Sequence, residues 1–137
     1  MDCLFCKIIS GEIPSAKIYE DENIFAFLDI NPTNIGHTLV IPKKHSKNIF
    51  DIEEKDLHSV MTGVQKISHA IRDAVNADGI NVMNNNEPSA GQIIFHTHFH
   101  IVPRFSEDGF RHWKGKRKYN DGEMEETVEK IKKSILQ

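Results

Sequence analysis

Three histidines stand at alternate positions in the second half of the chain, at His96, His98 and His100. On an extended strand, which rises about 3.3 Å per residue, alternate side chains share one face, so the three imidazoles would project together about 6.6 Å apart. A neutral imidazole offers a lone pair near pH 7, so such a row can supply a nucleophile or ligands for a metal ion. Two alternatives are a polar strand face without chemistry and a catalytic zinc held by two of these histidines and a third ligand.

The only two cysteines, Cys3 and Cys6, are separated by two residues near the N-terminus. No basic leader with a following apolar run precedes them, which favours a metal or redox role over a secreted disulfide framework. The alternative is a pair of reduced cysteines that bind no metal.

The hydrophobic periodicity indicates which elements must position these residues. Apolar residues recur every three or four positions in the helical segments and alternate in the strands. We expect helices over 3–10, 54–76 and 123–135, and strands over 17–19, 24–29, 37–41, 80–83 and 95–103. Asp51 and Glu54 are expected to cap the start of the long helix, and Gly79 its end. Strands followed by one long helix and a closing helix predict an α+β fold, with an antiparallel meander sheet of about five strands.

Length and composition predict one ordinary globular unit over residues 1–137. A net charge of −3 gives no global attraction to nucleic acid, and no stretch approaches the roughly 20 apolar residues that span a bilayer. We therefore expect a cytoplasmic protein that acts on neither nucleic acid nor membranes. A basic run around Trp113 is interpreted as a solvated loop, with a place near phosphates or at a dimer interface as the alternative. Its members are Arg111, Lys114, Lys116, Arg117 and Lys118.

The segment His96-Thr97-His98-Phe99-His100-Ile101-Val102 resembles the signature of the histidine triad (HIT) family, except that Thr97 is polar where an apolar residue is usual. The resemblance extends over most of the chain and weakens after Arg104; it includes residues 3–9, 27–29, 36–43, 84–86 and 91–92. It implies a HIT-like fold. It also implies a nucleotide hydrolase or nucleotidyl transferase, typically a homodimer, that acts on adenosine phosphoramidates, adenylated groups or dinucleoside polyphosphates.

By position, the resemblance implies that His98 is the nucleophile and forms a nucleotidyl-histidine intermediate. His37 and His100 match the other active-site histidines, which orient the nucleophile and contact phosphate oxygens. The donors expected to stabilise the phosphate charge are Asn85, Gln92 and backbone N–H groups around Gly91.

Asp29 is expected to accept the ribose hydroxyls. The slot expected for the purine base is apolar and consists of Phe5, Ile8, Phe27 and Ile30. One departure concerns Ile93, which stands where the family usually has serine or threonine, a hydroxyl that contacts the phosphate or the leaving group.

The resemblance is to the zinc-bearing, bacterial-type branch of the family, which implies a structural zinc on Cys3, Cys6, His45 and His96. Four protein ligands leave no open position for catalysis. Two further classes of function stay open: a zinc hydrolase that uses the histidine strand as ligands, and a nucleotide-binding interaction protein whose catalysis is incidental.

Overall fold

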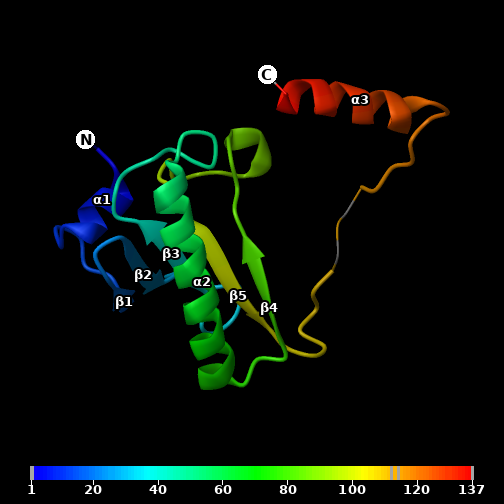
Figure 1. Cartoon of the computed structure of the whole chain (residues 1–137). Helices are drawn as coiled ribbons and strands as arrows, with labels where there is room; N and C mark the ends of the chain where they lie inside the picture. Colours follow the sequence, from blue (N-terminus) through cyan, green and yellow to red (C-terminus); the bar gives the residue numbers. More distant parts are fainter. Residues whose placement is uncertain (1, 112, 114, 137) are drawn as a thin grey trace.

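An antiparallel sheet forms the centre of the computed structural model, which describes residues 2–111, 113 and 115–136 (Figure 1). Its strands lie in the order β1-β2-β3-β5-β4. Their bounds are Lys17–Glu20 (β1), Ile24–Leu28 (β2), Thr38–Pro42 (β3), Gly79–Met83 (β4) and Phe99–Arg104 (β5). The helices are α1 (Leu4–Ile9), α2 (Glu54–Val75), the short 3₁₀ helix η1 (Pro88–Ala90) and α3 (Glu123–Ile135). The predicted α+β class with five antiparallel strands is confirmed.

The long helix α2 covers one face of the sheet (Figure 1). Its buried stripe packs against alternate residues of β2, β3 and β5 and consists of Val60, Val64, Ile67 and Ile71. Helix and strand approach closely at Gly63, where an added Cβ would lie 2.2 Å from Cδ1 of Ile24. A larger residue at this turn of α2 would therefore require the Ile24 side chain to shift.

The short helix α1 belongs to a second apolar cluster, formed by the opposite set of strand side chains. Alternate residues of a strand point to opposite faces, so Ile24 and Ala26 of β2 join the α2 core while Phe25 and Phe27 pack with α1. The same rule applies to β5, whose Phe99 belongs to the α2 core. His100, the next residue of β5, therefore lies on the α1 side of the sheet, and the rings of His96 and His98 contact Phe5 of α1.

The last strand begins later than its sequence pattern predicts. Strand β5 starts at Phe99, so His96 and His98 lie in an irregular segment before it. The cause is a long-range pairing, because the Thr97 N–H donates to the Ser46 carbonyl oxygen (2.8 Å) and the two hydroxyls lie 2.7 Å apart. This buried pairing also explains the polar residue at position 97.

Strand β3 extends one residue beyond its expected end at Ile41 and includes Pro42, opposite Ile24. The expected bounds of α2 are correct to within one residue, but its expected caps are wrong. Asp51 does not cap α2, because its carboxylate accepts from the backbone N–H groups of Lys47 and Asn48. The helix starts after Glu53, which makes no side-chain cap bond, and it ends at Asn76 in the left-handed conformation, whereas Gly79 begins β4.

The C-terminal helix α3 has the predicted bounds, but it has no buried residue and stands apart from the sheet (Figure 1). Its apolar stripe of Met124, Val128, Ile131 and Ile135 is exposed. Lys114 of the basic run lies outside the described residues, and the other members of that run are exposed. In the described part of the chain, no helix combines the length and apolar character required to cross a membrane.

Candidate functional site

A cavity of about 540 Å³ opens on the α1 side of the sheet. Helix α1, the end of β2, the segment between β4 and β5, and two of the histidines line it. The predicted site residues that line it are Phe5, Ile8, Phe27, Asp29, Ile30, Asn85, Gly91, His98 and His100. Its volume lies within the range of small-molecule sites, and apolar side chains dominate its walls. The structure thus brings most of the predicted nucleotide site together.

The hydrogen bonds of the His98 ring determine which of its nitrogens carries the proton. Nδ1 lies 2.7 Å from the backbone carbonyl oxygen of His96, and a carbonyl can only accept, so Nδ1 carries the hydrogen. The lone pair is then on Nε2, at the opposite edge of the ring. Burial lowers the pKa of His98, although the bond to His96 and the charge of Asp29 oppose this shift. The ring is therefore neutral near pH 7 and has one free lone pair.

His37 lies behind His100 and does not line the cavity. The Thr33 N–H donates to its Nδ1 (3.0 Å), so its Nε2 carries the hydrogen and donates to Nδ1 of His100 (2.9 Å). His100 therefore carries its own hydrogen on Nε2. Burial, followed by the charges of His98 and His37, lowers the pKa of His100 to about 4. His37 thus sets the tautomer in which His100 offers an N–H group.

A carboxylate completes a cluster with these two rings, because Oδ2 of Asp29 lies 3.7 Å from Nε2 of His37. The cluster does not suit a metal ion, since coordination through Nε2 of His37 would move the hydrogen to Nδ1, where the Thr33 N–H already donates. Neither of the two possible metal-binding groups among the described residues contains two of the histidines at 96, 98 and 100, which the zinc-hydrolase alternative requires. Burial lowers the pKa of His37, and Asp29 opposes that shift.

A second cluster, which includes His96 beside Phe5, has the geometry of a tetrahedral metal site. Nδ1 of His96 lies 3.5 Å from Sγ of Cys3, 3.6 Å from Sγ of Cys6 and 3.1 Å from Nδ1 of His45, which is itself 3.5 Å from Sγ of Cys6. Ligand bonds of about 2.3 Å to sulfur and about 2.05 Å to nitrogen place the ligand atoms of a tetrahedron roughly 3.3–3.8 Å apart. The four predicted ligands therefore fit such an ion.

Three separate segments supply these four ligands. Cys3 is the N-cap of α1, and its sulfur accepts from the Cys6 N–H (3.4 Å), which places both thiols on one turn. His96 has its Nε2 2.8 Å from the Pro42 carbonyl oxygen, so Nδ1 keeps the lone pair that a metal requires. Burial, and then the hydrogen bond and the charge of Cys3, raise the pKa of Cys6 to about 11.

Gln92 does not have the position that the sequence suggested. Its side chain is buried, and its amide nitrogen donates to the carbonyl oxygens of Lys47 (2.8 Å) and Ile94 (3.1 Å). Its oxygen accepts from Asn48 and from the Glu87 N–H. Both amide hydrogens are thus used inside the protein, so Gln92 shapes the cavity wall instead of donating to a phosphate.

Two asparagines that the sequence did not single out hold this wall. The Asn84 amide donates to the carbonyl oxygen of His98 (2.9 Å), and the Asn86 amide donates to the Asn84 oxygen (2.6 Å). The Ile49 N–H in turn donates to Asn86 (2.8 Å). The run of three asparagines was the available signal: Asn84 and Asn86 hold the backbone, and Asn85 between them faces the cavity.

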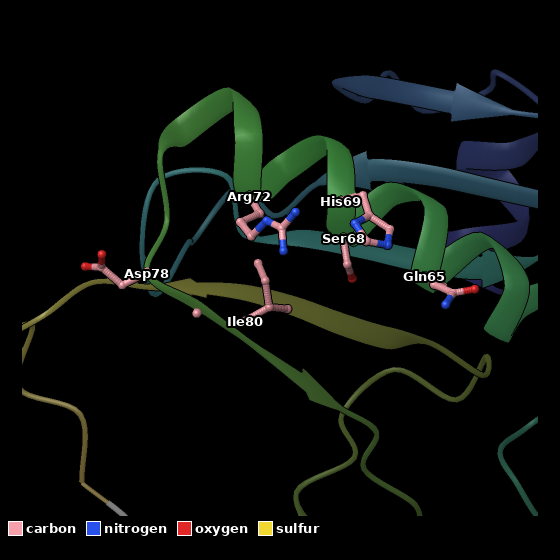
Figure 2. A pocket seen from close by; sticks show the side chains of 7 residues that line it. Gln65, Ser68, His69, Arg72, Asp78 and Ile80 are labelled. Atoms are coloured by element: carbon pink, nitrogen blue, oxygen red, sulfur yellow. The ribbon is translucent and has the colours of Figure 1, made fainter.

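Figure 2 shows another hollow, between α2 and β4, with a volume of about 300 Å³. Side chains of α2 and the start of β4 line it, and the labelled ones are Gln65, Ser68, His69, Arg72, Asp78 and Ile80. It contains one histidine, His69, which is exposed. The imidazoles with fixed tautomers all lie on the other side of the sheet, so the α1-side cavity is the candidate active site.

The chain is similar to known proteins over most of its length. The HIT domain family model matches residues 10–107. An uncharacterised HIT-like protein of Borreliella burgdorferi is 45% identical, with coverage of 99% of this chain and 95% of the relative. An Arabidopsis thaliana protein named adenylylsulfatase HINT3 is also 45% identical, over 78% of this chain and 54% of its own length.

Solved structures extend the likeness to the whole fold. A Streptococcus mutans crystal structure has a TM-score of 0.92 at 45% identity and covers 98% of this chain and 85% of its own. A histidine triad nucleotide-binding protein from Candida albicans has a TM-score of 0.87 at 33% identity, with 98% of both chains covered. A zinc-bound histidine triad family protein from Mycobacterium smegmatis has a TM-score of 0.78 at 35% identity, again with 98% of both chains covered.

Proposed function

The chain belongs to the HIT family, and we propose that it is a hydrolase or nucleotidyl transferase that attacks the α-phosphate of a purine nucleotide through His98. The observation that carries this proposal is the tautomer of His98, which leaves an unprotonated Nε2 on a ring that lines the cavity. Relatives described as an adenylylsulfatase and a nucleotide-binding protein support the same class of chemistry.

The cavity offers one region for each part of a nucleotide. The purine base occupies the apolar slot of Phe5, Ile8, Phe27 and Ile30, and Asp29 accepts the ribose hydroxyls. The α-phosphate lies against His98, where Asn85, the backbone at Gly91 and the N–H of His100 surround its oxygens. These donors are held before the substrate arrives, which is the arrangement that stabilises charge in phosphoryl transfer.

The reaction proceeds in two displacements. Nε2 of His98 forms a bond to phosphorus while the bond to the leaving group breaks, and the leaving group departs with the electron pair and takes up a proton from solvent. Water then attacks the nucleotidyl-histidine, the nitrogen–phosphorus bond breaks, and a proton is lost to solvent. In both steps the N–H of His100 donates to a non-bridging oxygen.

The charge of the cavity favours one kind of leaving group. Among its described lining residues there is one carboxylate, Asp29, and no lysine or arginine. Ile93, at the position where the family usually has a hydroxyl, is 82% exposed and lines the cavity. A phosphoramidate, with its single charged phosphate, suits these walls better than a dinucleoside polyphosphate with its several negative charges.

Mass spectrometry of the protein mixed with adenosine 5′-phosphoramidate tests this function. We expect an adenylyl adduct on His98, detected without acid treatment, and steady release of AMP. The variant His98→Ala is expected to form no adduct and to lose at least about 10³-fold in kcat, as enzymes do without their nucleophile. The matched control His58→Ala changes an exposed imidazole on α2 and should keep both. If the unmodified protein shows no adduct and no turnover, that result would contradict the proposal and favour a nucleotide-binding interaction protein.

We also propose that Cys3, Cys6, His45 and His96 hold a structural zinc ion. The support is the fit of the ligand distances, together with the zinc-bound relative. When bound, a four-ligand zinc ion supplies rigidity and no open position for catalysis. His96 then anchors the chain two residues before His98. A cytoplasmic location belongs to the same proposal, because a reducing compartment keeps both thiols available.

Elemental analysis of protein purified without a histidine tag measures the zinc content directly. We expect one zinc ion per chain, and we expect Cys6→Ser to lose it together with part of the thermal stability, because the metal links three segments. His98→Ala serves as the control and should retain zinc, since His98 is not one of the four ligands. Substoichiometric zinc that Cys6→Ser does not change would refute the metal site.

A homodimer through β4 completes the proposal. Two strands form the edges of the described sheet, but β1 carries charged residues and a bulge at Lys17/Tyr19, both of which discourage edge pairing. Strand β4 has no charged residue and exposes Val82 and Met83. A second copy that pairs with β4 would cover these groups.

Light scattering tests this assembly. We expect about twice the chain mass of 15.7 kDa for the unmodified protein and a shift toward the single mass for Val82→Glu, which buries a charge at the proposed interface. The control Ile18→Glu changes a residue of nearly equal exposure on the other edge strand and should stay dimeric. A monomeric unmodified protein, or a Val82→Glu variant with unchanged mass, would contradict this interface.

A further inference from the structure

Glu87 has a backbone conformation that side chains rarely adopt. Its φ of 78° and ψ of 155° fall in a region that is essentially confined to glycine. Such conformations persist only where the surroundings impose them, and they concentrate at functional sites. Glu87 begins the turn that leads through η1 to Gly91 and the cavity wall, so its surroundings must hold it in this conformation.

The Glu87 side chain ties this turn to the loop after β3. One carboxylate oxygen accepts from the Asn48 amide (2.7 Å) and the other from the Lys47 ammonium group (3.1 Å). Asn48 is only 1% exposed, so its hydrogen bond to Glu87 is shielded from competition by solvent. The Glu87 N–H donates to the Gln92 side chain (2.8 Å), and its carbonyl oxygen accepts from the N–H groups of Ala90 (3.0 Å) and Gln92 (3.2 Å).

The turn held by Glu87 presents the residues proposed to bind the phosphate. Gly91 closes the turn with a φ of 92°, and a Cβ built on it would lie 3.7 Å from the amide nitrogen of Asn85. On the N-terminal side of Glu87, Asn84 donates to the carbonyl oxygen of His98. A shift of the backbone at position 87 would therefore displace both the proposed phosphate donors, Asn85 and Gly91, and the Asn84 amide that holds the backbone at His98.

A glycine would take this backbone conformation without strain, so the simplest structural role does not require a carboxylate. The ion pair with Lys47 is also a weak reason, because both side chains are about half exposed and such pairs contribute little. What a glycine could not supply is the anchor on buried Asn48.

We propose that Glu87 is a positioning residue, whose carboxylate holds the 87–92 turn against Asn48 so that Asn85 and Gly91 face the α-phosphate. This inference rests on the proposed function, since it concerns the geometry of the same reaction. It goes further in assigning a role to a residue that does not line the cavity.

The variants Glu87→Gly and Glu87→Gln separate positioning from stability. Glu87→Gly removes the anchor and the strain together, so we expect an unchanged or higher melting temperature, with kcat lowered about tenfold or more and KM changed little. Glu87→Gln keeps an oxygen for the Asn48 amide and should recover part of kcat. The control Glu107→Gly removes another positive-φ glutamate (φ 65°), in the turn after β5, and should leave kcat unchanged.

Two results would overturn the inference. One is a kcat of Glu87→Gly equal to that of the unmodified protein, and the other is a loss of kcat that parallels the loss of melting temperature across all three variants. Absence of turnover in the unmodified protein would refute the proposed function instead. In that case, amide hydrogen exchange and the affinity for AMP test the role of Glu87. Faster exchange confined to 88–92 and weaker AMP binding in Glu87→Gly would support it, and unchanged exchange and affinity would refute it.

Discussion

The hydrogen bond from Nδ1 of His98 to the His96 carbonyl oxygen is the contact on which the proposed chemistry depends. An imidazole has two nitrogens and, when neutral, one hydrogen, so a fixed acceptor at one nitrogen decides what the other can do. A fixed hydrogen-bond partner at one ring nitrogen also sets the tautomer of the two neighbouring rings. His96 uses Nε2 on the Pro42 carbonyl and keeps Nδ1 for the cysteine cluster, whereas His100 accepts at Nδ1 from His37 and presents an N–H. Three chemically identical side chains thus receive three different roles from their partners.

The fold supplies these partners by combining regular and irregular backbone. Strand β5 starts only at Phe99, so the carbonyl oxygen of His96 is free to accept from the ring of His98. The departure from strand geometry is held by Thr97 and Ser46, and Asn84 fixes the backbone at His98 from the other side. Rigid supports of this kind keep a nucleophile oriented without help from the substrate.

Side-chain periodicity predicted the elements well because burial of apolar residues is a local pattern. It recovered α2, α3 and the antiparallel strands within a few residues, and the resemblance grouped Phe5, Asp29, Asn85 and His98 around one cavity. The pattern could not predict bonds between distant segments. Gln92 was assigned to the phosphate because an amide suits that task, but its partners at Lys47 and Asn48 lie more than 40 positions away. The role of Thr33 depends on a backbone N–H, which any residue other than proline offers, so no residue type indicates it.

Nitrogen-15 NMR of the imidazoles near neutral pH tests the central claim most directly, because protonated and unprotonated ring nitrogens have distinct chemical shifts. For His98 we expect a protonated Nδ1 and an unprotonated Nε2 in the absence of nucleotide. Burial keeps the pKa of this ring below the ordinary histidine value, so the neutral form should persist below about pH 6.5. A hydrogen on Nε2, in either the opposite tautomer or the imidazolium form, would leave no nucleophile facing the cavity and would contradict the account.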